Sequence, residues 1–379
     1  MEIKSKVPLE TCDDLSLAYT PGVAEVCRMI ARDSKLANKY TIKNNTVAIV
    51  TDGSAVLGLG NMGPLAALPV MEGKAILHKK FGGLNAFPIC LNTQDTEKII
   101  ETIKLIAPAF GAIHLEDIAA PGCFEIERRL QNELNIPVLH DDQHCTAVVV
   151  LAALINSLKC SQPIPCRSTG QAYGLKKQPI NRLTTTKIVI NGAGSAGIAI
   201  ANLLLAYGFK NLMILDSQGT IFSGRKNLSS EKKQLAKITN RKKINGDLLV
   251  ALKGADVFIG VSKGGLLHPK MIKLMNSRPI IFALANPIPE IMPAAAKKAG
   301  AFVVATGRGD FPNQINNVLV FPGVFRGALD HGVKLITQAM LIKAAENLLR
   351  LVKRPATNKI LPGVFDKRVM PAVAKAIKN

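Results

Sequence analysis

The sequence contains few aromatic residues, and its cysteines suit neither a zinc ribbon nor a set of paired disulfides. Its 379 residues include no tryptophan and four tyrosines, and aromatic side chains make up 4% of the chain. Because proteins that bind single-stranded nucleic acid stack the bases on aromatic rings, this scarcity argues against that function. The seven cysteines are odd in number and form no C-x-x-C pair, so we expect free thiols in a reducing cytosol.

Long apolar runs are also missing. The N-terminal segment MEIKSKVPLE has no apolar core of the kind found in signal peptides. The longest uninterrupted apolar run, residues 147–155, is far shorter than the roughly 18 residues that a membrane-spanning helix needs. We therefore expect a cytoplasmic protein that has no membrane partner.

Acidic residues are scarce relative to basic ones. The 27 Asp and Glu residues face 48 Lys and Arg residues, which gives a formal net charge of +21. Such a charge predicts anionic partners, and these can be nucleic acid, a membrane surface or small acids. The content of 48% hydrophobic and 20% charged residues is that of a folded globular protein, and the length indicates two or three domains of roughly 100 to 200 residues each.

Apolar runs of strand length alternate with helical patterns along the chain. In the first half, the predicted strands are residues 47–51, 89–92, 112–115 and 137–139, and the predicted helices are residues 64–80, 98–106, 123–134 and 146–158. In the second half, strand-length runs occur at residues 257–261, 279–285, 302–305 and 319–322. The polar stretch 160–186 has no periodicity and is predicted to be a linker or surface loop. The alternation predicts an α/β fold with a parallel sheet, doubly wound in the second half.

A glycine-rich motif follows an apolar strand in the second half and opens an apolar helix. Its residues are Gly192, Ala193, Gly194, Ser195, Ala196 and Gly197. In a dinucleotide site Gly192 permits a tight turn, Gly194 lets the backbone approach the pyrophosphate, and Gly197 allows the helix to pack closely on the strand. The strand before and the helix after the motif favour a dinucleotide site over the alternative of a tight turn that binds nothing.

An acidic residue, Asp216, ends the next strand nineteen residues after Gly197. A carboxylate there accepts hydrogen bonds from the ribose hydroxyls, which favours NAD, because a 2′-phosphate would meet like charge. Residues 225–243 carry eight basic side chains and one acidic one. This run forms a solvated helix face or reaches a 2′-phosphate, so NADP stays possible.

Two pairs of carboxylates follow two predicted strands of the first half. These pairs are Glu116-Asp117 and Asp141-Asp142. Ligands of open α/β sheets bind at the carboxyl ends of the strands, and paired carboxylates repel each other unless a cation lies between them. Oxygen ligands suit Mg²⁺ or Mn²⁺, whereas His140 and His144, which flank the second pair, suit a softer metal. We therefore predict a site for Mg²⁺ or Mn²⁺.

Two further side chains are candidates for proton transfer. Lys74 stands in the apolar segment MEGKAIL, where burial would lower its pKa toward that of a general base; the alternative is a surface lysine with an apolar stem. Tyr19 precedes a Pro-Gly turn and can present its hydroxyl as an acid; the alternative is packing in the core.

Together these segments resemble the malic enzyme family in its short bacterial form. The matching stretches are LSLAYTPGVAEVC, TDGSAVLGLGNMGPLAALPVMEGKAILHKKFGG, IHLEDIAAPGCFEIE, PVLHDDQH, IVINGAGSAG, ANPIPEI and NNVLVFPGVFRGALD, which follow the family's order from about residue 10 to the C-terminus. The resemblance implies an N-terminal α/β domain for substrate and metal at residues 1–150, a Rossmann-type NAD(P)-binding domain at residues 151–360, and a C-terminal helix at residues 361–379 that packs back on the body.

The resemblance also implies a role for each site residue. The implied metal ligands are Glu116, Asp117 and Asp142. Lys74 would remove the proton from the C2 hydroxyl of malate, Tyr19 would protonate C3 of the enolpyruvate, and Asp141 would orient Lys74. The implied cofactor contacts are Gly192, Gly194, Ser195, Ala196, Gly197, Asp216, Arg225, Ser262 and Asn286, and the implied substrate contacts are Asn286 and Asn317.

The resemblance predicts that the chain is an enzyme. It would convert L-malate to pyruvate and CO₂ with reduction of NAD or NADP, require Mg²⁺ or Mn²⁺, and act as a homodimer without a nucleic-acid partner. A related 2-hydroxy-acid dehydrogenase or a malolactic enzyme is the alternative within the enzyme class. A basic protein that binds nucleic acid is the alternative outside it.

Overall fold

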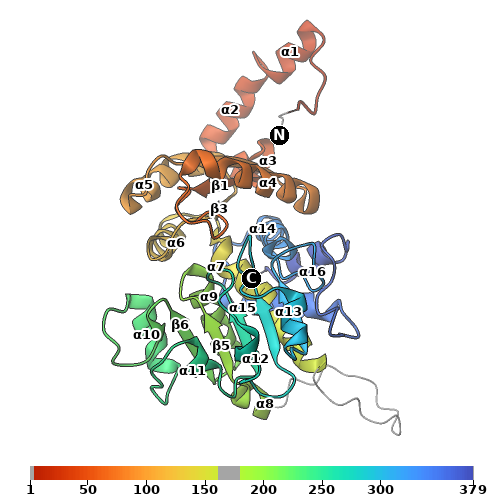
Figure 1. Cartoon of the computed structure of the whole chain (residues 1–379). Helices are drawn as coiled ribbons and strands as arrows, with labels where there is room; N and C mark the ends of the chain where they lie inside the picture. The colour runs from red at the N-terminus through yellow and green to blue at the C-terminus, as the bar shows by residue number, and fades with distance from the viewer. Residues whose placement is uncertain (1–3, 161–179, 379) are drawn as a thin grey trace.

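The computed structural model describes residues 4–160 and 180–378 and contains two largely parallel β-sheets, one in each half of the chain (Figure 1). The elements of the first half are α1 (Cys12–Ala18), α2 (Val23–Arg32), η1 (Ser34–Leu36), α3 (Ala37–Tyr40), η2 (Lys43–Asn45), β1 (Thr46–Thr51), α4 (Pro64–Gly82), β2 (Asn85–Cys90), α5 (Thr96–Ile106), η3 (Ala107–Ala109), β3 (Ala112–Leu115), α6 (Gly122–Glu133), β4 (Val138–His140) and α7 (Asp141–Cys160).

The second half continues the alternation of helix and strand. Its elements are α8 (Ile180–Thr185), β5 (Ile188–Asn191), α9 (Ser195–Tyr207), β6 (Leu212–Asp216), β7 (Gly219–Thr220), α10 (Ser230–Ile238), α11 (Leu248–Leu252), β8 (Val257–Gly260), α12 (Pro269–Ile272), β9 (Ile280–Ala283), α13 (Pro293–Lys298), β10 (Val303–Thr306), η4 (Asn317–Leu319), α14 (Phe321–Asp330), α15 (Gln338–Arg350) and α16 (Val369–Ala374).

The strand order of both sheets places the carboxyl ends of their parallel strands along one edge of each sheet. The first sheet has the order β2-β1-β3-β4 with all pairs parallel, and the second has the order β10-β9-β8-β5-β6-β7, in which only the β6-β7 pair is antiparallel. In the second sheet the strand order reverses between β5 and β8, which is the switch point where doubly wound sheets bind their ligands. The predicted α/β fold with a Rossmann-type domain is confirmed.

Helices cover both sheets and form a continuous core between them. The inner core contains residues of β1 and β5 together with α4, α7, α9, α14 and α15. On the outer faces, α5 and α6 cover the first sheet, and α11, α12 and α13 cover the second. Strands buried on both faces need apolar residues at nearly every position, and all six residues of β1 (TVAIVT) are buried.

Helix α7 joins the two halves through the middle of the molecule. It is the one described helix that is long and apolar enough to cross a membrane, and 78% of its most apolar window is buried inside the protein. Its apolar composition therefore reflects its contacts with α9 and α15.

Several predicted elements differ from the structure; the helix predicted at 146–158, for example, is α7, Asp141–Cys160. The strand predicted at 89–92 begins earlier, at Asn85, because Pro88 lies in an edge strand, where a missing N–H is tolerated. The strand predicted at 319–322 is wrong: this apolar run is the end of η4 and the start of α14, with Pro322 in the first turn of the helix, where proline is favoured. Of the loop predicted at 160–186, residues 180–185 form helix α8, and residues 161–179 lie outside the described residues.

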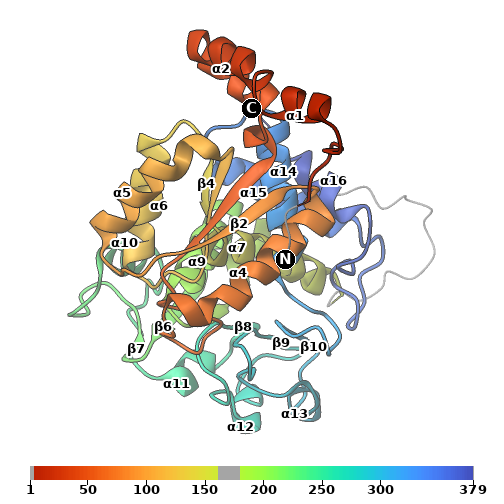
Figure 2. The ribbon, with the colours of Figure 1, turned by 90° about the horizontal axis from the view of Figure 1, so that it is seen from above.

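Both ends of the chain add helices to the two sheets. Helix α16 packs on α14 and α15, and a Cβ at Gly327 of α14 would lie 2.4 Å from the carbonyl oxygen of Ala374. Helices α1 and α2 project from the margin of the molecule in both views (Figures 1 and 2). The domain boundaries at residues 150 and 360 stay predictions.

Candidate active site

Carboxylates gather at the carboxyl edge of the first sheet. Glu116 and Asp117 directly follow β3, and Asp141 and Asp142 form the first turn of α7, directly after β4. Carboxylate oxygens of Glu116, Asp117 and Asp142 all lie within 4.8 Å of one another. Since β3 and β4 are adjacent and parallel, the sheet brings together the two pairs that the sequence separates by 25 residues.

Lys74 extends from α4 into this group of carboxylates. The residue is 8% exposed, its Nζ lies 2.9 Å from Glu116 Oε1, and it also donates a hydrogen bond to Asp141 Oδ2. The ring of Phe321, from α14, lies 4.7 Å from Nζ and covers the ammonium group. The prediction of a buried lysine therefore fits the structure, and the alternative of a surface lysine is wrong.

Asp117 has a constrained backbone and an unsatisfied oxygen. Its φ of +54° is a left-handed conformation that is uncommon for residues other than glycine. In this conformation its backbone N–H donates to Asp142 Oδ2 at 2.9 Å, while its own Oδ1 accepts from the N–H of Leu57 at 3.4 Å. The buried Oδ2 has no hydrogen-bond partner, which is costly unless a cation binds there.

The crowding of carboxylates shifts their pKa values upward. Burial and the charge of Asp142 raise the pKa of Glu116 to about 7, and burial with the charges of Asp142 and Glu116 raises the pKa of Asp117 to about 9. Burial also raises the pKa of Asp141 to about 6, although Lys74 opposes the shift. A group of oxygens that repel one another fits a divalent cation, with Glu116, Asp117 and Asp142 as its ligands.

The same charges act on Lys74 in the opposite sense. Burial by itself lowers its pKa, but the charges of Asp141, Glu116 and Asp142 outweigh burial and raise the pKa above its ordinary value. The lowered pKa that is predicted from burial alone is therefore wrong for this arrangement of charges. All three carboxylates belong to other elements, so the segment MEGKAIL did not reveal them.

Two groups of possible metal ligands occur among the described residues, Glu116-Asp117-Asp142 and His114-Glu116-Asp141, and neither contains His140 or His144. His144 Nε2 lies 2.9 Å from Glu127 Oε2 in α6, and Glu127 also accepts from the backbone N–H of His140 at 2.7 Å. Glu127 therefore anchors the start of α7 from behind the site.

A pair of buried histidines behind Glu116 was missed by the sequence argument. His114 Nε2 lies 2.7 Å from Glu116 Oε2, and His114 Nδ1 lies 2.9 Å from His78 Nε2 in α4. Burial lowers the pKa of His114 to about 3 and that of His78 well below its ordinary value, so both rings are neutral. His114 positions Glu116 by hydrogen bonding, and His78 in turn holds His114. His114 lies in β3 and Glu116 directly follows it. Because residues two apart along a strand point to the same face of the sheet, this spacing could have indicated that the two side chains meet.

Tyr19 is the predicted site residue that the structure does not bring to this cluster. It is the C-cap residue that follows α1, it is 67% exposed, and among the described residues its side chain makes no hydrogen bond. In the described part of a single chain, Tyr19 neither contacts the carboxylate cluster nor packs in the core.

The glycine-rich turn has the geometry of a cofactor cradle. Gly192 has φ +124°, and a Cβ there would lie 2.6 Å from the carbonyl oxygen of Val261; a Cβ at Gly197 would lie 1.8 Å from the carbonyl oxygen of Gly192. A Cβ at Gly194 would meet no protein atom within 4 Å, so the backbone there faces open space. Gly194 is also the N-cap of α9 and provides no capping side chain, which leaves the helix N–H groups of Ser195 and Ala196 open to an anion.

Ser262 lies beside this turn. Its hydroxyl accepts from Asn191 Nδ2 at 3.0 Å, and its backbone N–H donates to Glu290 Oε1 at 3.2 Å. Glu290 is fully buried and also accepts from the N–H of Ala285 at 3.1 Å, so it ties the ends of β8 and β9 together. The sequence argument did not single out Glu290, although it belongs to the segment ANPIPEI.

Asp216 lies at the end of β6, with two cations against it. Arg225 and Lys232 both approach Asp216 Oδ2, the latter at 2.8 Å, and burial, which would raise its pKa, is outweighed by these hydrogen bonds, so the pKa falls to about 2. Both Asp216 and Arg225 are predicted cofactor contacts, and the structure brings them into direct contact.

Asn286 and Asn317 lie where the second half of the chain meets the first. A Cβ at Gly58, in the loop after β1, would lie 2.7 Å from the carbonyl oxygen of Asn286. Asn317 begins η4, four residues before Phe321, which covers Lys74. Asn286 is thus close in space to the loop after β1, and Asn317 is close along the chain to Phe321, which covers Lys74.

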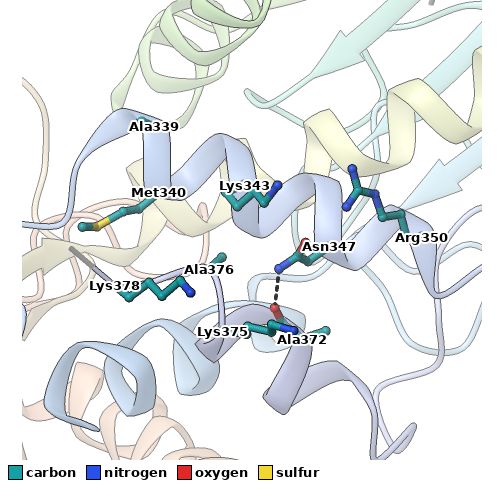
Figure 3. A pocket seen from close by; sticks show the side chains of 9 residues that line it. All are labelled: Ala339, Met340, Lys343, Asn347, Arg350, Ala372, Lys375, Ala376 and Lys378. Carbon is teal, nitrogen blue, oxygen red and sulfur yellow. Dashed lines mark hydrogen bonds between the residues drawn. The ribbon is translucent and has the colours of Figure 1, made fainter. Parts of the chain in front are cut away.

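An open groove elsewhere in the molecule contains none of the predicted site residues. It has a volume of about 650 Å³, lies between α15 and α16, and is lined by the cations Lys343, Arg350, Lys375 and Lys378 (Figure 3). Asn347 Nδ2 donates to the carbonyl oxygen of Ala372 across it at 2.9 Å. Part of the basic excess thus lies away from the acidic cluster.

Comparison with known families accounts for both halves of the chain. Residues 1–131 match the model of the malic enzyme N-terminal domain, and residues 144–378 match the model of the malic enzyme NAD binding domain. The chain belongs to the malic enzyme family.

Individual relatives cover the whole chain. The bifunctional malic/malolactic enzyme of Bacillus subtilis is 53% identical, over 100% of this chain and 88% of that protein. The NADP-dependent malic enzyme of Halomonas elongata is 44% identical, over 98% of this chain and 83% of that protein. The crystal structure of the NAD-dependent malic enzyme of Thermotoga maritima superimposes with a TM-score of 0.91 at 47% identity, over 100% of this chain and 96% of the other. The chain is thus an NAD(P)-dependent enzyme of the malic enzyme family, as predicted.

Proposed function

We propose that this enzyme oxidises L-malate and releases pyruvate and CO₂, with NAD or NADP as hydride acceptor and Mg²⁺ or Mn²⁺ as the resident cation. The observation that carries the proposal is the buried contact of Lys74 with Glu116 and Asp141, beside the group of oxygens from Glu116, Asp117 and Asp142. Malate²⁻ and NAD⁺ give pyruvate⁻, CO₂ and NADH, so the proton taken from the C2 hydroxyl balances the proton delivered to C3. The enzyme would act in the cytoplasm as a homodimer.

Lys74, in the cluster, and Tyr19, which lies outside it within one chain, would divide the proton transfers. Lys74 Nζ accepts the proton of the C2 hydroxyl as hydride leaves C2, and Asp141, which accepts a hydrogen bond from Nζ, fixes the direction in which the amine points. The hydroxyl of Tyr19 donates a proton to C3 after the C4 carboxylate has left. Phe321 keeps water from the face of Lys74 that it covers.

Glu116, Asp117 and Asp142 would hold the cation. A bound divalent cation supplies positive charge that offsets these carboxylates and polarises the C2 oxygen of the substrate. The cation would offset the charges of Glu116 and Asp142, which leaves burial opposed chiefly by Asp141. This change lowers the pKa of Lys74 toward the neutral amine that a base requires.

The test is direct. Purified enzyme should form pyruvate from L-malate with NAD and Mn²⁺, and NADH should accumulate in equal amount. Neither product should form with D-malate or after removal of divalent cations with EDTA. Full activity after EDTA treatment would contradict the proposed metal site.

A second candidate function is a malolactic conversion. It is favoured by the 53% identity to an enzyme described as both malic and malolactic. In that reaction the reduced cofactor returns its hydride to pyruvate, so lactate forms without net NADH. Measuring lactate and NADH from the same sample distinguishes the two outcomes.

The glycine-rich turn allows a prediction that separates cofactor binding from folding. In Gly194→Ala the added methyl group meets no protein atom but occupies the space proposed for the pyrophosphate. We expect the KM for NAD to rise about tenfold or more, with an unchanged melting temperature. In the matched variant Gly197→Ala the methyl group meets the carbonyl oxygen of Gly192, so the melting temperature should fall by several degrees. An unchanged KM in Gly194→Ala would argue against the predicted pyrophosphate position.

The surroundings of Asp216 allow a prediction about cofactor choice. Asp216→Ser removes the carboxylate and leaves Arg225 and Lys232 free to bind a 2′-phosphate. We expect the ratio of kcat/KM for NADP to that for NAD to rise about tenfold or more. Asp310→Ser, which removes an exposed carboxylate paired with Arg308, is the control and should leave the ratio unchanged.

A further inference from the structure

Four cationic side chains line the groove between α15 and α16. Lys343 and Arg350 belong to α15, and Lys375 and Lys378 follow α16 (Figure 3). No carboxylate of the described residues belongs to the lining. Neither the glycine-rich turn nor the carboxylate cluster uses any of these cations, so the proposed function leaves them unexplained.

Acidic residues offset little of this charge. Glu346 Oε2, on α15, lies 3.6 Å from both Lys343 Nζ and Arg350 Nη2, so two cations share one carboxylate. The other two cations of the groove form no ion pair within the part of the chain that the structure describes. The positive charge also acts on the neighbouring helix α7, where burial and, after it, the charge of Arg350 lower the pKa of Lys159. The groove is therefore a concave surface of unbalanced positive charge.

The C-terminal segment, residues 331–379, concentrates the basic excess of the chain. It contains ten Lys and Arg residues against two Asp and Glu residues, a net charge of +8 out of the +21 for all 379 residues. A second groove in this segment is lined by Lys353, Arg354, Lys359 and Arg368, with Asp366 as its acidic residue. A surface with one sign of charge raises the local concentration of oppositely charged ligands. Part of the charge excess that indicates anionic partners is thus located here.

The size and the lining of the groove between α15 and α16 fit a small molecule. Its volume of about 650 Å³ lies within the roughly 300–1,000 Å³ of small-molecule sites. Ala339, Ala372 and Ala376 line it with small side chains, which leaves the space open. Asn347 Nδ2 donates to the carbonyl oxygen of Ala372 at 2.9 Å and holds the two helices together. Among the described residues no aromatic side chain lines the groove, so the bases of a nucleic acid find no ring on which to stack.

The spacing of the cations fits an anion whose charge is spread over several groups. Lys343 and Arg350 are seven residues apart, which is two helical turns, or about 10 Å along one face of α15. Lys375 and Lys378 lie on the opposite wall. A single phosphate or carboxylate cannot contact both ends of this row, whereas a chain of linked phosphates presents charged oxygens along its length. Lysine and arginine are the side chains that bind phosphate oxygens through charge-assisted hydrogen bonds.

We propose that the groove between α15 and α16 is a binding site for a small anion that carries a triphosphate group. Two classes of compound share this chemistry, nucleoside triphosphates and inorganic triphosphate. For a nucleoside triphosphate, Ala339 and Met340 offer an apolar surface to the base. The site is separate from the carboxylate cluster and from the glycine-rich turn, and it does not depend on the proposed oxidation of malate.

Calorimetry measures the binding. Full-length enzyme is titrated with inorganic triphosphate and, separately, with ATP, in EDTA and with NADH in excess, so that neither a bound cation nor the glycine-rich turn attracts the probe. One site per chain is expected. The double variant Lys343→Gln with Lys375→Gln removes one cation from each wall and should weaken binding about tenfold or more. Equal affinity for the two probes assigns the site to the phosphate chain alone, and tighter binding of ATP assigns the apolar wall to its base.

A second double variant controls for the loss of charge. Lys297→Gln with Lys298→Gln removes two exposed lysines from the end of α13 and should bind both probes with wild-type affinity. All four substituted lysines are exposed, so both double variants should fold normally.

Thermal melting gives an independent measure of binding. Helix α15 packs on α7, which begins with Asp141, and α16 packs on α14, which begins with Phe321. An anion that bridges α15 and α16 therefore braces helices that reach the carboxylate cluster, and the melting temperature should rise with its concentration. The rise should occur in wild type and in the α13 double variant, and it should vanish in the groove double variant.

Three results would overturn the proposal. The first is the absence of saturable binding by either probe. The second is equal weakening in the two double variants, which would reduce the effect to the net charge of the protein. The third is tighter binding of a single-stranded oligonucleotide than of triphosphate, with the same dependence on Lys343 and Lys375, which would assign the groove to nucleic acid instead.

Discussion

Lys74→Ala is expected to reduce kcat for pyruvate formation by about a hundredfold to ten-thousandfold, the usual contribution of a positioned acid or base. Lys74 is the buried amine at the carboxylate cluster, 2.9 Å from Glu116 and hydrogen-bonded to Asp141. Steady-state kinetics with saturating malate, NAD and Mn²⁺ measure the effect.

Two companion variants separate the chemistry from the fold. Removing Lys74 leaves buried carboxylates without their cationic partner, which is destabilising in itself. Lys74→Arg keeps a positive charge that cannot be lost at neutral pH, so it should preserve the fold and still be inactive. Lys79→Ala, in the same helix, removes an exposed lysine bonded to Asn85 and should retain normal kcat. Normal activity in folded Lys74→Arg would rule out Lys74 as the base.

Asp117→Asn is expected to abolish metal-dependent activity while stabilising the protein in EDTA. The amide keeps the acceptor for Leu57, and asparagine tolerates the left-handed backbone at φ +54°. Loss of one anionic ligand should weaken Mn²⁺ binding by about a hundredfold or more, measured by calorimetry. Activity should fall in parallel at fixed Mn²⁺.

The stabilisation follows from the sign of the pKa shift. Burial, with Asp142 and Glu116, raises the pKa of Asp117 in the folded protein to about 9 from 3.8. A carboxyl whose folded pKa exceeds its unfolded pKa costs stability at every pH above the unfolded value, and the cost grows until the folded pKa is reached. In EDTA the melting temperature of Asp117→Asn should therefore exceed that of wild type, by a margin that widens as the pH rises from about 5 to about 9.

A matched control changes a carboxylate to an amide elsewhere. Asp95 caps α5 by accepting from the N–H groups of Glu97 and Lys98, and asparagine caps helices as well as aspartate does. Asp95→Asn should keep wild-type Mn²⁺ affinity and show no pH-dependent gain in melting temperature. If Asp117→Asn instead melts below wild type in EDTA at a pH of about 9, the raised pKa of Asp117 is contradicted.

Much of the fold and of the cofactor turn was predictable because the signals are local. The glycine-rich turn follows the buried strand β5 and opens the apolar helix α9, so the strand, the glycines and the helix all lie within one short segment of the sequence. The strand 112–115 was predicted at its observed bounds, because its residues are all buried and the chain turns at both ends. The strand predicted at 319–322 is wrong because this segment is buried on all sides, and a short apolar run of that kind is compatible with a helix as well as with a strand.

The sequence by itself determined which chemical groups the candidate site offers: a lysine, paired carboxylates after two strands, and a glycine-rich turn of the kind that binds dinucleotides. Only the tertiary structure decided how these groups act on one another. The charges around Lys74 come from the end of β3 and the start of α7, and their sum reverses the pKa shift that burial alone would cause. Likewise the sequence predicts Tyr19 as a site residue, but its distance from Lys74 depends on the path of helices α1 and α2, and within one chain Tyr19 is 67% exposed. Electrostatic energy depends on separation in space, and separation along the chain does not reveal it.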